Sequence, residues 1–157
     1  MFESDIVFHW WQNLEQERGD RAKLRRAGSL SEICFIPVFH DLYRQLKDAN
    51  YFKDKNIALV AGVLSHIRVN SDIEFPHELA LKKVHSDSPV VSGLRFQRLI
   101  KNETPEELFH SIIRVIHLLG NKANVRELAE SLYWWNEKAR IKWAFKYYEK
   151  AHISKKN

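Results

Sequence analysis

The chain has 157 residues, of which 45% are hydrophobic and 29% are charged. These ordinary proportions favour one globular domain, residues 1–157, with a sizeable core. The formal net charge is +5 and the isoelectric point is about 9.3, which is compatible with nucleic acid as a partner. Cys34 is the only cysteine, which excludes an internal disulfide and suits a cytoplasmic location, and no apolar run approaches a transmembrane span.

The charge is segregated along the chain. Residues 1–20 hold five acids against one base, whereas residues 137–157 hold seven bases against two acids. The start of the sequence, MFESDIVFHWW, lacks a basic region and a long apolar run, so no signal peptide is expected there. Only five glycines and four prolines interrupt the sequence, which favours helices.

Three stretches in the first half of the chain have helical apolar periodicity. Residues 5–15 form the first, with two tryptophans as core anchors and base stacking as the alternative interpretation. The second begins at Pro37, which suits a first helical turn, and runs to Asp48. Residues 57–69 are apolar on nearly every side, so we expect a central, buried helix in which Gly62 permits close packing.

A dense basic cluster lies at residues 19–27, GDRAKLRRA. Asp20 can cap a short helix there, and a helical period of 100° puts the three arginines on one side, opposite Leu24 and Ala27. We expect an exposed arginine fork for phosphate, with a solvated basic face as the alternative. The predicted contacts are Arg21, Lys23, Arg25 and Arg26.

Residues 70–92 are the least regular part of the sequence, and we expect a long loop that includes a short helix within residues 75–84. His77, Glu78 and His85 resemble metal ligands only by residue type. Their spacing is not HExxH and no third ligand is nearby, so neither a metal site nor a cofactor is predicted.

A second basic element follows at residues 94–101, LRFQRLIK. Its apolar face carries Phe96 and Leu99, and its opposite face is expected to contact nucleic acid through Arg95, Arg98 and Lys101. Thr104 then begins a capping box for a helix to Leu119. On the polar face of that helix, we expect a phosphate contact by Arg114, with plain solvent exposure as the alternative.

The last two helices are expected from Asn124 to Trp135 and from Glu137 to about residue 152. We interpret Trp134 and Trp135 as core or subunit contacts. The final helix has an apolar face with Ile141, Ala144, Phe145 and Tyr148, and a separate aromatic face with Trp143 and Tyr147. A third face carries a lysine row of Lys138, Lys142, Lys146 and Lys150, in which Lys138 and Lys142 are predicted nucleic-acid contacts.

No stretch alternates strictly, so no strand is predicted, and about eight helical segments indicate an all-α domain with a basic surface. Residues 153–157 are expected to fray. The chain lacks a glycine-rich phosphate loop and a GxSxG elbow, so catalysis is not expected. Two alternatives remain: a helix-turn-helix regulator that uses the last two helices, and a small enzyme that uses His110, His117 and an acid.

The order of these segments resembles one protein family. Trp10-Trp11, GDRAKLRRA, LRFQRLIK, VRELAESLYWW and KARIKWAFKYY occur in the order found in the small subunit of the type I-E CRISPR surveillance complex, Cascade, the CasB family. The resemblance covers about residues 8–148, and its weakest part is residues 70–90. It implies an all-α, non-enzymatic subunit that pairs with a second copy and assembles with other Cascade proteins and guide RNA. It also implies a basic path for target and displaced DNA strands that stabilises the R-loop.

Overall fold

The computed structural model describes residues 2–151 and is all-α, as predicted, with ten helices in that part of the chain. The helices are α1 (Ser4–Asn13), α2 (Arg18–Arg26), α3 (Leu30–Ile33), α4 (Pro37–Asp48), α5 (Asp54–Leu64), α6 (Phe75–Leu79), α7 (Gly93–Ile100), α8 (Pro105–Leu118), α9 (Val125–Tyr133) and α10 (Glu137–Ala151). Two strands, β1 (Val69–Asn70) and β2 (Lys122–Ala123), pair in parallel, contrary to the prediction of no strand. They were missed because a two-residue strand is too short to show alternation. The predicted frayed tail lies outside the described residues.

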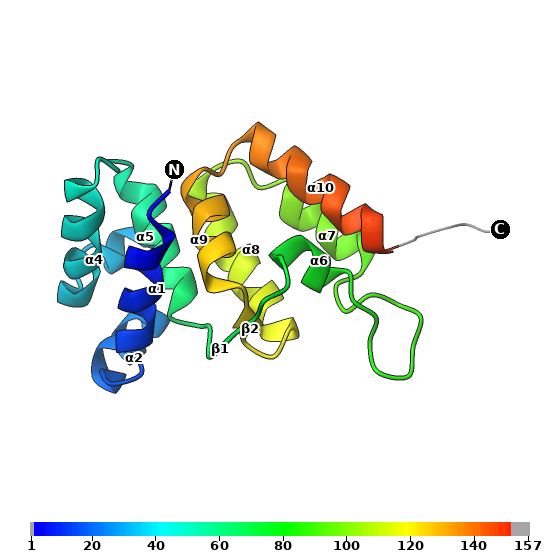
Figure 1. The fold of residues 1–157 in the computed structure, drawn as a ribbon, viewed down its shortest axis with the longest axis horizontal. Coiled ribbons are helices and arrows are strands. Elements are labelled where there is room, and N and C mark those ends of the chain that lie inside the picture. The colour runs from blue at the N-terminus through cyan, green and yellow to red at the C-terminus, as the bar shows by residue number, and fades with distance from the viewer. Residues whose placement is uncertain (1, 152–157) are drawn as a thin grey trace.

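Helix α5 lies at the centre of the molecule, between α1–α4 on one side and α8 and α9 on the other (Figure 1). All of its residues from 57 to 64 are buried, which confirms the predicted central helix. Gly62 permits the close approach of α8, because a Cβ atom there would lie 2.7 Å from Cε1 of Phe109. The helix starts three residues earlier than predicted and ends at Leu64 rather than at residue 69.

The predicted helix caps are mostly confirmed. The side chains of Thr104 and Asn124 each accept a hydrogen bond from the backbone N–H three residues later, and Thr104 forms the full capping box. Either Ser31 or Ser29 was expected to cap the segment after α2, and the structure selects Ser29, which caps the short helix α3. The exception is Asp20, which was predicted to cap α2. The helix begins earlier, at Arg18, so Asp20 lies inside its first turn. There its carboxylate interacts favourably with the positive end of the helix dipole but does not cap the helix.

Of the two apolar faces of α10, the structure buries the aromatic one. Trp143 and Tyr147 are buried, and the ring of Tyr147 stacks on Phe96 of α7 with centroids 4.0 Å apart. The other face, which carries Phe145, remains exposed. The sequence shows both faces with equal clarity, because periodicity identifies a stripe but not the surface that covers it.

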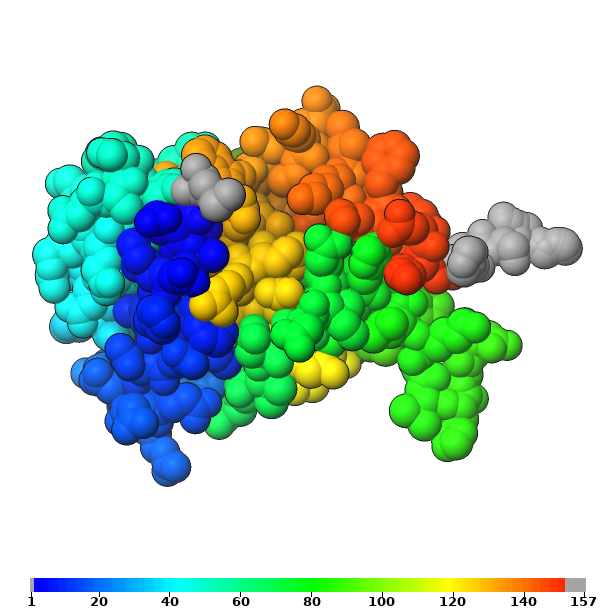
Figure 2. All heavy atoms as spheres, in the orientation of Figure 1, coloured from blue at the N-terminus to red at the C-terminus, as the bar shows by residue number. Residues whose placement is uncertain are grey.

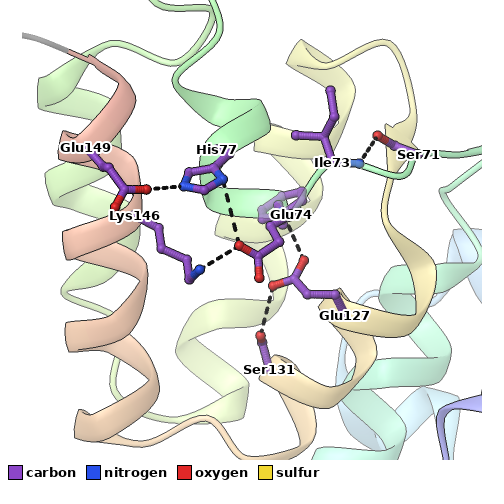
Figure 3. A network of polar contacts seen from close by, with 9 residues as sticks. Ser71, Ile73, Glu74, His77, Glu127, Ser131, Lys146 and Glu149 are labelled. Carbon is purple, nitrogen blue, oxygen red and sulfur yellow. Dashed lines mark hydrogen bonds and ion pairs between the residues drawn. The ribbon is translucent and has the colours of Figure 1, made fainter.

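Polar contacts fasten α6 to α9 and α10 (Figure 3). Glu74, just before α6, accepts a 2.6 Å bond from Lys146, and the ring of His77 lies 2.7 Å from Glu149. Between α6 and α9, the Glu127 carboxylate accepts a hydrogen bond from the backbone N–H of Phe75 at 2.7 Å. Burial is the main cause that raises the pKa of Glu127 from 4.5 to about 7.

The expected long loop at residues 70–92 is divided by α6, which ends at Leu79 rather than extending toward residue 84. Beyond it, the segment 81–90 projects from the body of the molecule (Figure 2). Its base is held by the bond from Val90 N–H to Leu81 O, 2.7 Å, and by a bridge between Lys82 and Pro89.

Candidate nucleic-acid interface

Arg21 does not belong to an exposed arginine fork. Its side chain is only 7% exposed, and it donates to the carbonyl of Ser65 at 3.1 Å and to that of Ile67 at 2.7 Å. Burial and the nearby Arg68 lower the pKa of its guanidinium. Arg21 satisfies carbonyls at the C-terminal end of α5, where helical bonding stops. The prediction that Arg21 is exposed as part of an arginine fork is therefore wrong.

The other basic residues of α2 are exposed but diverge. Arg25 lies close enough to His66 to lower the pKa of that imidazole. Lys23 and Arg26 instead line a shallow hollow of about 330 Å³ together with the exposed ring of Phe35. The basic side chains of α2 thus face separate surfaces and do not form one bidentate fork.

Helices α7 and α8 bring three predicted arginines together. Arg95 and Arg98 of α7 and Arg114 of α8 line one hollow of about 480 Å³, which we call the α7–α8 groove. The remaining lining residues are Leu99, Ser111, Val115, His117 and Leu118, none of which is acidic. Within residues 2–151, none of these arginines forms an ion pair, so their charges are free to meet an anion.

The arginines of α7 are mounted on a rigid helix. Ser92 caps it by accepting the N–H of Arg95 at 3.2 Å, and Phe96 and Leu99 are buried on the opposite face. This confirms the predicted division of α7 into an apolar face and a basic face. Arg114 projects from α8, where its Nη2 lies 3.5 Å from the hydroxyl of Ser111. Rigid mounting lowers the entropic cost of ordering these side chains on a ligand.

A histidine pair lies between the groove and Arg25. His117 Nε2 is 3.4 Å from His66 Nδ1, and burial, reinforced by His117 and Arg25, lowers the pKa of His66 to about 4. His66 is therefore neutral near pH 7 and interrupts the positive charge between the two arginine sites. No local sequence pattern indicates this pair, because its members are 51 residues apart.

The predicted lysine contacts lie elsewhere. Lys138 and Lys142 line a hollow of about 380 Å³ between α9 and α10, together with Glu127 and Glu130. Lys101 is exposed at the C-terminal end of α7 but does not line the groove. These three lysines are accessible, but the structure does not bring them to the groove arginines.

The tryptophans and histidine considered as functional residues mostly have structural roles. Trp135 is buried and donates to Asn102 O at 2.8 Å, whereas Trp134 is partly exposed beneath the ammonium of Lys53. His110 Nε2 lies 2.9 Å from the carbonyl of Gly28, so it links α8 to the turn after α2. The described chain holds no group of three or more His, Cys, Asp or Glu side chains suited to a metal, and none of its helices is long and apolar enough to cross a membrane.

Comparison with known proteins identifies the family. The sequence model for CRISPR-associated protein Cse2 matches residues 20–148. The chain belongs to the Cse2 family. Cse2 is the CasB small subunit, so the resemblance found in the sequence is confirmed.

The Cse2 fold is also found in a solved structure. A chain in the crystal structure of E. coli Cascade bound to a PAM-containing dsDNA target superposes with a TM-score of 0.72 and 19% sequence identity. The match covers 98% of this chain and 99% of the other, so the two share one fold over their full length. No curated protein sequence matches the chain.

Proposed function

We propose that this chain is the non-catalytic small subunit of a type I-E Cascade complex. In this role it binds the backbone of target or displaced DNA and stabilises the R-loop during antiviral defence. Its partners are the other Cascade proteins, guide RNA, the two DNA strands and a second copy of itself. Membership of the Cse2 family and the fold shared with a chain of DNA-bound Cascade support this role.

The observation that carries the nucleic-acid role is the convergence of Arg95, Arg98 and Arg114 on a groove without acids. Guanidinium groups give planar, permanently charged contacts that match phosphate oxygens. Leu99, Val115 and Leu118 supply an apolar lining on which sugars can rest. No arrangement for reading base edges accompanies the arginines, so we expect sequence-independent binding.

Modest contacts suffice for such a role because strand exchange in an R-loop is nearly balanced. The new heteroduplex is about as stable as the DNA duplex that it replaces, so a few backbone contacts shift the equilibrium. The isolated subunit then binds nucleic acid weakly, and its log affinity falls with log salt at a slope of about 0.7 to 0.9 per phosphate contacted.

The test is R-loop lifetime in a reconstituted Cascade complex that carries Arg98→Ala and Arg114→Ala. Each substitution removes a charge-assisted contact worth about 1.5 to 3 kcal/mol, so we expect the lifetime to fall by about tenfold or more. The matched control is Arg44→Ala with Lys47→Ala, which removes the same charge from exposed positions on α4. Equal lifetimes for the two double variants would contradict the proposal, whereas equal melting temperatures would confirm that both remain folded.

A further inference from the structure

Phe35, in the turn between α3 and α4, presents its ring to solvent. It is 85% exposed, and no large apolar side chain within residues 2–151 is more exposed. The backbone of the turn is nevertheless regular. The N–H of Phe35 donates to the carbonyl of Glu32 at 3.1 Å, and the next N–H donates to that of Ile33 at 3.0 Å. A ligand therefore meets a ring whose backbone was already ordered during folding.

The surroundings of the ring are basic. Lys23 and Arg26 are three residues apart on α2, so they share one face of that helix, and both line the hollow beside Phe35. Within residues 2–151, neither cation forms an ion pair. The one acid of the hollow, Glu32, packs its carboxylate against Gly28, where a Cβ atom would lie 3.1 Å from Oε2. Two free cations thus stand beside one exposed aromatic ring.

A protein partner fits this hollow poorly. The only other apolar side chains that line it are Ala27 and Ile36, and both are already half-buried. A specific protein interface buries about 800 Å² on each partner, far more than one ring among charged side chains offers. The combination of an aromatic face with lysine and arginine is instead typical of sites for single-stranded nucleic acid, where a base stacks on the ring and the cations meet the phosphates.

The hollow lies close to the α7–α8 groove. The ring of His110 on α8 meets the turn after α2, with Nε2 2.9 Å from the carbonyl of Gly28. The residues next to these two, Ala27 and Ser111, line the hollow and the groove respectively. The two sites are therefore separated by little more than the contact between α8 and this turn, and one flexible strand can reach both.

We propose that Phe35 is a stacking platform for an unpaired base of single-stranded nucleic acid, whose flanking phosphates contact Lys23 and Arg26. In a duplex, the neighbouring bases already cover both faces of each base, so the site selects an unpaired strand. The inference rests on the proposed function and deepens it, because the displaced strand of an R-loop is the one with unpaired bases. Every base has an aromatic face, so stacking agrees with sequence-independent binding.

The test is fluorescence anisotropy of the full chain with three probes: an oligothymidylate, an abasic strand of the same length, and a duplex. Phe35→Ala should weaken oligothymidylate binding by about tenfold and leave the other two affinities unchanged, because only the first probe offers an unpaired base. Phe35→Trp should restore binding. The matched control is Phe52→Ala, which removes a 57% exposed ring from the turn between α4 and α5 and should change none of the affinities.

The two cations give a second readout. Lys23→Gln with Arg26→Gln should weaken both single strands and reduce the salt slope by about 0.7 for each cation removed, whereas Phe35→Ala should keep the slope of the wild type. Equal melting temperatures check that the variants are folded.

Two results for Phe35→Ala would overturn the stacking site alone: an unchanged affinity for oligothymidylate, or an equal loss on all three probes. If the variant kept its affinity but lost self-association, the ring would be a contact between protein chains. A wild-type chain that bound none of the probes at low salt would instead remove the proposed function, and the stacking site with it.

Discussion

Helix α2 carries four basic residues within six consecutive positions, whereas the arginines of the α7–α8 groove come from two helices between residues 95 and 114. The denser cluster makes the poorer site. In α2, Arg21 meets two backbone carbonyls and is used by the fold, and its neighbours point to different surfaces. In the groove, all three arginines meet open space without an acid. What surrounds a charge in space, rather than its density in the sequence, decides whether a ligand can use it.

The largest expected effect is that of Arg21→Met, which keeps the apolar stem and removes the guanidinium. The carbonyl of Ser65 loses the Arg21 donor, and that of Ile67 keeps only the indole N–H of Trp11, so we expect the free energy of unfolding to fall by about 2 to 4 kcal/mol. Arg25→Met, on the same helix but exposed, should change it by less than about 0.5 kcal/mol. Chemical denaturation of both variants measures the difference, and equal stabilities would mean that Arg21 is not structural.

Glu127 is the acidic counterpart of Arg21, a partly buried carboxylate that accepts a backbone N–H. Because its folded pKa of about 7 exceeds its ordinary value of 4.5, the stability that it contributes is complete below pH 4.5 and is lost as the pH rises through 7. Glu127→Gln can keep the bond to Phe75 N–H without the charge, so we expect it to stabilise the protein by about 1 to 3 kcal/mol at pH 8. Denaturation at pH 5 is the control, since the gain should be smaller there. A gain that does not change with pH would refute this account.

Charge reversal compares the two basic regions directly. Arg95→Glu with Arg98→Glu should shorten the R-loop lifetime most, by about tenfold or more, because both residues line one groove. Arg25→Glu with Arg26→Glu should have a smaller effect, since these two arginines diverge. Circular dichroism checks that each variant is folded.

The lysine row provides the lower limit of this series. Lys146 already bonds to Glu74, and lysine is a compact, strongly hydrated charge, so Lys146→Glu with Lys150→Glu should affect the R-loop least. If this variant proved the most defective while both arginine pairs behaved like wild type, the nucleic-acid path would have to be moved to α10.

The smallest expected effect concerns the histidine pair. The folded pKa of His66, about 4, lies below its ordinary value of 6.5, so its contribution to stability is complete above pH 6.5 and is lost as the pH falls toward 4. The wild-type protein should lose stability between pH 7 and pH 5. We expect His66→Gln to lose about 1 kcal/mol less over the same range. Thermal denaturation at the two pH values measures it. If the variant and the wild type lost the same stability between pH 7 and pH 5, the lowered pKa of His66 would be refuted.

Local rules predicted much of the fold from the sequence. Thr104 and Asn124 were identified as caps because capping depends on residues within one turn. The apolar face of α7 was identified because its only alternative face is charged. Family membership was also recognisable, since the order of several short segments is preserved along the chain.

The misjudged features depend on contacts between distant residues. The carbonyls that hold Arg21 lie 44 and 46 residues further along the chain, so no local pattern separates it from Arg25. The groove was predicted in parts, as Arg95 and Arg98 on one helix and Arg114 on another, but not as one site. Its assembly depends on how α7 packs against α8, which periodicity does not specify.

The position of α5 has a consequence for synthesis of the chain on the ribosome. Residues 57–64 are covered partly by α2, α3 and α4, which precede them, and partly by α8 and α9, which end at Tyr133. When the first seventy residues have emerged, an apolar helix is present but half of its partners have not yet been made. The core around α5 therefore closes only after Tyr133 has emerged, and a chain released before α8 and α9 exposes α5 to aggregation.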